Sequence, residues 1–87
     1  MITERERIEL RKLFQGNYTS DVLLILNEKK IFNKNGSPFN VQYIRMVFQG
    51  VRKNQEIESA IWQLAVERKQ EIDQQKSRKD LILKNIP

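Results

Sequence analysis

Six side chains between residues 40 and 49 are of types that can bond or pack against the edges of nucleic-acid bases. This stretch contains no acidic residue. Glutamine and asparagine can bond adenine, arginine can bond guanine, and a methionine or tyrosine side chain can contact the methyl group of thymine. The expected base contacts are Asn40, Gln42, Tyr43, Arg45, Met46 and Gln49.

The basic residues around this stretch form a charge excess. Residues 29 to 53 contain six Lys or Arg and no Asp or Glu, whereas the complete chain of 87 residues has a formal net charge of +5. Such a surface favours a polyanion, since neutralising phosphates releases counterions. A basic face that meets only solvent is the alternative. The expected phosphate contacts are Lys30, Lys34, Asn35, Arg52, Lys53 and Asn54.

Several kinds of chemistry lack the residues that they need. The chain has no Cys and no His, which excludes zinc fingers, Ser–His or Cys–His nucleophiles and an imidazole base. The acidic residues lie on faces expected to contact solvent, and their spacing indicates no buried catalytic pair. We therefore expect no enzyme activity, no cofactor, no metal and no small-molecule substrate.

Length and hydropathy favour one soluble intracellular domain. The longest apolar run in the first half, Val22 to Leu26, has five residues, whereas a membrane-spanning helix needs about 20. The N-terminal residues alternate acid and base from Glu4 to Arg7, unlike a signal or transit peptide. We expect a cytoplasmic protein with no membrane partner.

Apolar periodicity and capping signals predict two helices in the first third of the chain. One covers residues 4 to 14, begins at a capping box and ends near Gly16. The second covers residues 20 to 29, with Thr19 or Ser20 as its N-cap. This second helix is apolar on nearly all sides, which is typical of a helix buried between neighbours.

The segment after the second helix contains turn-forming residues. Asn35 and Gly36 favour a two-residue turn of type I′, and Pro38 prevents a continuous helix. Residues 31 to 39 are expected to form either a short β-hairpin or an irregular loop, because a two-stranded ribbon of this size is marginally stable.

Two more helices are predicted in the remainder. Residues 40 to 49 present one apolar face, with Asn40 as N-cap and Gly50 after the end. A fourth helix begins after Asn54, its apolar stripe runs as far as Ile72, and Trp62 is expected in the core. This stripe consists of Ile57, Ile61, Leu64, Ala65, Arg68 and Ile72, while Leu81, Ile82, Leu83 and Ile86 restore apolar character near the end.

A buried helix, a connector, an amphipathic helix and a basic turn follow one another in the order of a helix-turn-helix. We expect an all-α, four-helix domain over residues 1 to 75. Residues 76 to 87 are expected to form a helical extension or tail. The apolar end could fold back on the domain or bind another chain, including a second copy in a homodimer.

The same region resembles known DNA-binding families. Residues 40 to 54 (NVQYIRMVFQGVRKN) resemble the recognition helix and following turn of lambda-repressor-like and phage helix-turn-helix regulators. Residues 26 to 39 (LNEKKIFNKNGSPF), followed by Tyr43-Ile44-Arg45, are similar to the DNA-binding region of large serine recombinases. The connector is longer than the usual three or four residues. No strand-exchange activity is implied, because no counterpart of the recombinases' catalytic serine domain accompanies the similarity.

The function that these patterns favour is binding of double-stranded DNA by a small phage, mobile-element or bacterial transcriptional regulator. The helix at residues 40 to 49 would read the major groove. The main alternative is a protein-interaction module, such as a phage-encoded inhibitor of an acidic host protein. RNA binding is less favoured, since no glycine–aromatic sheet motif is present.

Overall fold

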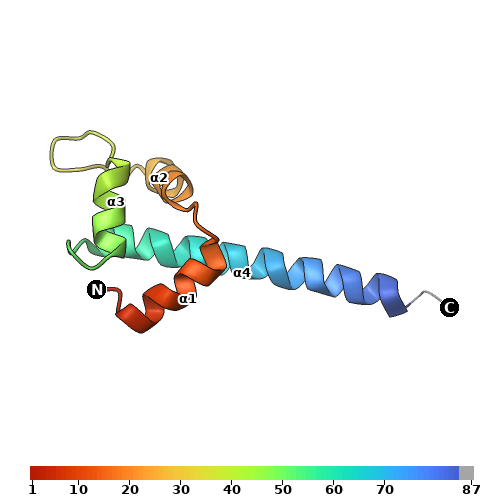
Figure 1. The fold of residues 1–87 in the computed structure, drawn as a ribbon. Coiled ribbons are helices and arrows are strands. Elements are labelled where there is room, and N and C mark those ends of the chain that lie inside the picture. The colour runs from red at the N-terminus through yellow and green to blue at the C-terminus, as the bar shows by residue number, and fades with distance from the viewer. Residues whose placement is uncertain (85–87) are drawn as a thin grey trace.

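A computed structural model of the chain describes residues 1 to 84, which fold into four helices and contain no strand (Figure 1). The first three helices gather around the N-terminal half of the fourth, whose other half extends away from them. The all-α prediction is confirmed. The helices are α1 (Glu4–Phe14), α2 (Thr19–Glu28), α3 (Val41–Phe48) and α4 (Gln55–Lys84).

The first helix has the predicted bounds and the predicted N-terminal capping box. The Glu6 amide donates to Thr3 Oγ1 at 3.2 Å, and the Thr3 amide donates to Glu6 Oε1 at 2.9 Å. These two bonds satisfy amides that a helix start otherwise leaves without a partner. The chain then leaves the helix through two residues of positive φ, Gln15 and Gly16.

The second helix begins one residue earlier than predicted and differs in two further ways. Tyr18, rather than Thr19 or Ser20, is its N-cap, and no side chain caps its first amides. Leu24 is 57% exposed, so the prediction of a helix buried on nearly all sides was wrong. The reason is that its neighbours cover one face, where Val22 and Leu26 are fully buried.

The connector between α2 and α3 is an irregular loop, and the hairpin alternative is not formed within it. Asn33 organises the loop: its Oδ1 accepts from the amides of Asn35 and Ser37 at 2.9 and 3.0 Å. The Gly36 amide also donates to the Asn33 carbonyl. Gly36 has a φ of +79° but Asn35 has no positive φ, which excludes the predicted type I′ turn.

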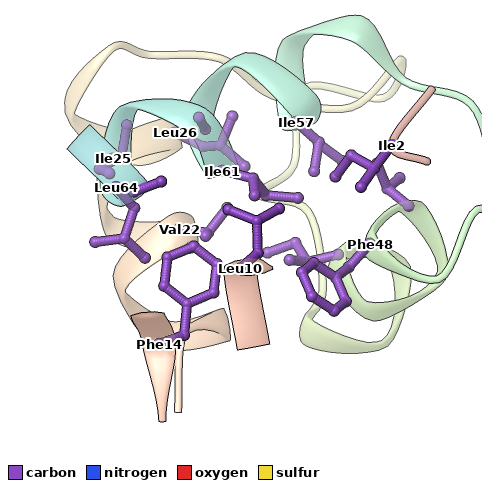
Figure 2. Packing of buried hydrophobic residues seen from close by; sticks show 14 residues of the cluster. Ile2, Leu10, Phe14, Val22, Ile25, Leu26, Phe48, Ile57, Ile61 and Leu64 are labelled. Atoms are coloured by element: carbon purple, nitrogen blue, oxygen red, sulfur yellow. The ribbon is translucent and has the colours of Figure 1, made fainter. Parts of the chain in front are cut away.

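A single apolar core joins the four helices (Figure 2). The N-terminal half of α4 contributes most to it, and each of the other helices adds two to three side chains from one face. Trp62 was expected in the core but is 39% exposed, since it lies about 160° around α4 from the buried Leu64. The buried apolar residues are Ile2, Leu10, Phe14, Val22, Ile25, Leu26, Ile44, Val47, Phe48, Ile57, Ala60, Ile61, Leu64 and Ala65.

The fourth helix extends well beyond the core. It has 30 residues, which corresponds to a length of about 45 Å at 1.5 Å per residue. Every side chain from Lys69 to Leu83 is exposed, while the helix continues unbroken to Lys84. Ile86, which the sequence grouped with this end, lies outside the described residues. In the described part of the chain, no helix combines the length and the apolar character needed to cross a membrane.

Arg68 marks the end of this packing and connects α4 to the turn between α1 and α2. Its guanidinium donates to the carbonyl oxygens of Phe14 and Asn17 at 3.2 and 3.1 Å, and also to the carboxylate of Asp21. It also lies 5.9 Å from the centre of the Phe14 ring. The sequence placed Arg68 in an apolar stripe but did not predict this set of polar contacts.

Replacing Arg68 with alanine should lower the free energy of unfolding by about 1.5–3 kcal/mol, the range for hydrogen bonds to charged groups. The substitution leaves two carbonyl oxygens and a carboxylate without their donor. Chemical denaturation measures this change. Lys69→Ala is the matched control, because its side chain forms one exposed ion pair with Asp73, at 3.9 Å, and such pairs contribute little. Equal effects of the two substitutions would contradict the role of Arg68.

Candidate nucleic-acid interface

The third helix packs on the core through one face and is capped at both of its ends. Ile44 and Val47 are fully buried, and Asn40 Oδ1 accepts from the Tyr43 amide at 2.7 Å. At the other end the Gly50 amide donates to the Val47 carbonyl, and Gly50 takes a φ of +81°. This closure is typical of glycine-terminated helices. The anchoring fixes which face of α3 points away from the core.

The outward face of α3 presents three of the predicted base contacts. Gln42, Arg45 and Gln49 are exposed. Met46 and Tyr43 are half-buried, and the Tyr43 ring stacks on Phe39 with 5.6 Å between centroids. Glutamine and arginine are therefore the side chains most available to a ligand, while tyrosine also supports the connector.

Asn40 and Asn54 both act as helix caps. The Asn54 Oδ1 accepts from the Ile57 amide at 3.0 Å at the start of α4, in the same way as Asn40 does for α3. In each residue the side-chain oxygen is used within the protein and the NH₂ group remains a donor. The sequence predicted both caps and also assigned both residues to DNA contacts; the caps are confirmed.

Asn40→Ala should destabilise the protein by about 1 kcal/mol, because the first turn of α3 loses its side-chain acceptor. Asn40→Ser is the matched control: serine is a comparable N-cap, so we expect thermal unfolding close to that of the original protein. Stability that does not differ between alanine and serine would show that this bond contributes nothing.

A groove beside α3 brings together residues that are distant in the sequence. It has a volume of about 370 Å³ and is lined by Arg11, Phe14, Gly16, Tyr18, Arg45, Phe48 and Gln49. No acidic residue of the described chain lines it. Arg11 lies 6.0 Å from the centre of the Phe48 ring, and Tyr18 packs on the same ring at 4.7 Å. The groove thus brings Arg45 of α3 together with Arg11 of α1 and with Tyr18, the N-cap of α2.

Tyr18 carries a neutral hydroxyl group in this basic surrounding. Burial raises the pKa of its phenol, and the positive charges of Arg45 and Arg11 oppose that effect in part. The phenol is therefore protonated at neutral pH, where it can donate a hydrogen bond. A neutral donor beside two guanidinium groups is suited to binding an anionic oxygen.

Sequence reasoning missed Arg11 and Tyr18. Arg11 lies in a helix that also contains acidic residues, so the sequence around it shows no excess of positive charge. Tyr18 stands in a short turn with no neighbouring base. Only the packing of α1 and α2 against α3 brings them next to Arg45, and no local spacing signals that arrangement.

A second groove, on the other side, is lined by some of the predicted phosphate contacts. Its volume is about 670 Å³, and it lies between the connector and the first residues of α3 and α4. Lys34, Asn35 and Asn54 line it together with two base candidates, Asn40 and Tyr43. Glu56 also lines it, so this side is less uniformly positive than the sequence segment suggested.

The other predicted phosphate contacts line neither groove. Lys30 is exposed in the turn that closes α2, where its backbone has a φ of +58°. Arg52 and Lys53 are exposed between α3 and α4. These bases surround α3 rather than share one pocket with it, an arrangement that allows separate contacts with an extended ligand.

Comparisons with protein-family models, with curated proteins and with solved structures find no significant match for this chain.

Proposed function

We propose that the protein binds double-stranded DNA and inserts the exposed face of α3 into the major groove. The observation that carries this proposal is that Arg45 and Gln49 share an acid-free groove with Arg11 and Tyr18. Side chains able to read bases therefore adjoin side chains able to hold phosphate. A small transcriptional regulator or accessory factor of a phage, mobile element or bacterium is the role that we propose for such a domain.

The contacts divide by chemistry. Arg45 and Gln42 read base edges, because their planar groups form paired hydrogen bonds with guanine and adenine. Arg11 and Tyr18 bind a phosphate on one side of α3, and Arg52 and Lys53 bind the backbone near its C-terminal end. The remaining phosphate contacts, from the connector and the turn before it, are Lys30, Lys34 and Asn35.

The dependence of affinity on salt tests this proposal. Each phosphate contact contributes about 0.9 to the slope of the logarithm of the binding constant against the logarithm of salt concentration. The five basic phosphate contacts, Arg11, Lys30, Lys34, Arg52 and Lys53, predict a slope of about −4.5 by that rule. Fluorescence anisotropy with a labelled duplex at increasing salt measures it. A slope shallower than about −2 would contradict the proposal, because two or fewer phosphates would then be bound.

A protein-interaction module remains the competing function. Exposed arginines could equally bind an acidic protein surface. That function predicts no retardation of random duplexes in a gel and an acidic protein that co-purifies with the chain. The two outcomes are opposite, so the gel assay distinguishes them.

A further inference from the structure

The distal half of α4 carries exposed apolar side chains. Ile82 is 62% exposed, and Ile72, Leu81 and Leu83 are exposed too. Basic residues accompany this apolar end: Lys76, Arg78 and Lys79 lie within the preceding six residues. The end of the helix is therefore both apolar and positively charged.

A groove of opposite charge lies between α2 and the proximal half of α4. It has a volume of about 290 Å³, and its apolar lining consists of Leu24, Ile25 and Leu64. Four acidic residues and one base also line it. Arg68, the base, is paired with Asp21, which leaves the other three carboxylates to set the local charge. These are Glu28, Glu67 and Glu71.

The groove and the apolar end lie on one face of α4. Because an α-helix has 3.6 residues per turn, residues 18 positions apart point in the same direction, as Leu64 and Ile82 do. The two are separated by about 27 Å along the axis. Glu71 and Arg78 lie about 20° and 40° around the helix from this line, on the same side of it. Along this face of α4, from the proximal to the distal end, apolar side chains are followed by acidic, then basic, then again apolar side chains.

We propose that two copies of the chain pair through this face, with their α4 helices antiparallel. Ile82 of each copy enters the groove of the other beside the partner's Leu64. That register also brings Arg78 beside the partner's Glu67, since the two lie on the same flank of the paired face and at nearly the same height along it. A two-fold dimer requires a self-complementary surface, and the order of charges on α4 meets that requirement. The inference does not depend on DNA binding.

Measurement of molar mass in solution, by sedimentation or light scattering, tests the pairing with the complete chain. The original protein should be a dimer, and Ile82→Glu should weaken association about 100-fold, because two buried isoleucines are lost per dimer. Val66→Glu is the matched control. Val66 is 56% exposed and lies on the opposite face of α4, about 200° from Leu64, so the dimer should persist.

Charge reversal at the proposed pair tests the register. Glu67→Lys alone and Arg78→Glu alone should each weaken the dimer about tenfold, because each creates two like-charge pairs. An equimolar mixture of these two variants should restore dimerisation, since both pairs are then of opposite charge. Helical circular dichroism confirms that each variant is folded.

Several outcomes would overturn the inference. These are a monomeric original protein, a dimer unaffected by Ile82→Glu, equal weakening by Val66→Glu, or a mixture of the charge variants that stays monomeric.

Discussion

Replacing Arg45 with alanine should raise the dissociation constant for the protein's preferred duplex by about 10- to 100-fold. This range corresponds to the loss of one paired hydrogen bond to a base, about 1–3 kcal/mol. Because Arg45 is exposed on α3, the fold should be retained. Titration of the preferred duplex and of a duplex with each guanine replaced in turn measures both affinity and preference.

The matched control for this substitution is Arg5→Ala. It removes the same charge from an exposed position in the first turn of α1, where Glu4 and Glu6 adjoin it. This substitution should change the dissociation constant by less than about threefold, as expected for an arginine that contacts neither nucleobases nor phosphates. If Arg45→Ala weakened all duplexes equally, Arg45 would be a phosphate contact instead. If the two substitutions had the same small effect, the role of α3 would be wrong.

Phe48→Ala should be the most destabilising single substitution near the interface. The side chain is buried between α3, α1 and the start of α2, with its ring 6.4 Å from that of Phe14 and 4.7 Å from that of Tyr18. Truncation of a buried phenylalanine costs about 3–5 kcal/mol, which should lower the Tm by more than about 12 °C in a domain of this size. Thermal unfolding followed by circular dichroism checks the prediction.

Val51→Ala serves as the control for Phe48→Ala. Val51 follows α3 and is 69% exposed, so its truncation should change stability by less than about 0.5 kcal/mol. A Phe48 variant as stable as the Val51 variant would show that the aromatic cluster does not hold α3. Phe48 also lines the groove together with Arg11 and Arg45. Its truncation should therefore reduce the proposed DNA binding, because the two guanidinium groups would be misplaced.

The parts of the fold that the sequence predicted well are those set by local interactions. The capping box at Thr3 and the caps at Asn40 and Asn54 each join residues three positions apart, so spacing alone revealed them. The apolar period of α3 likewise predicted its buried face. These features depend on contacts within a helix or at its end.

The features that the sequence did not predict arise from contacts between distant segments. Arg68 bonds carbonyl oxygens more than 50 residues away, and no local pattern distinguishes it from other charged residues of α4. The exposed Leu24 and Trp62 have the same origin, since only the placement of neighbouring helices decides which apolar residues are covered. The irregular loop was one of the two predicted alternatives for the connector, but its turn is not of type I′, and the Asn33 side chain accepts from two amides within it.

The candidate site shows the same division. The sequence singled out Gln42, Arg45 and Gln49, and all three are exposed, two of them on α3 and Gln49 as its C-cap. Arg11 and Tyr18 join Arg45 and Gln49 only through the packing of distant segments, so a linear charge count could not include them. The acidic Glu56 beside the connector was missed for the same reason.

Selection from a pool of random duplexes tests the central claim most directly, with the original protein and the Arg45→Ala variant carried in parallel. The original protein should enrich a short motif. The variant should lose preference at a guanine within it while retaining preference elsewhere, because the proposed function assigns a single base pair to Arg45. A pool that shows no enrichment with the original protein, or the same motif at full strength with the variant, would contradict the assignment of α3 as the DNA-reading helix.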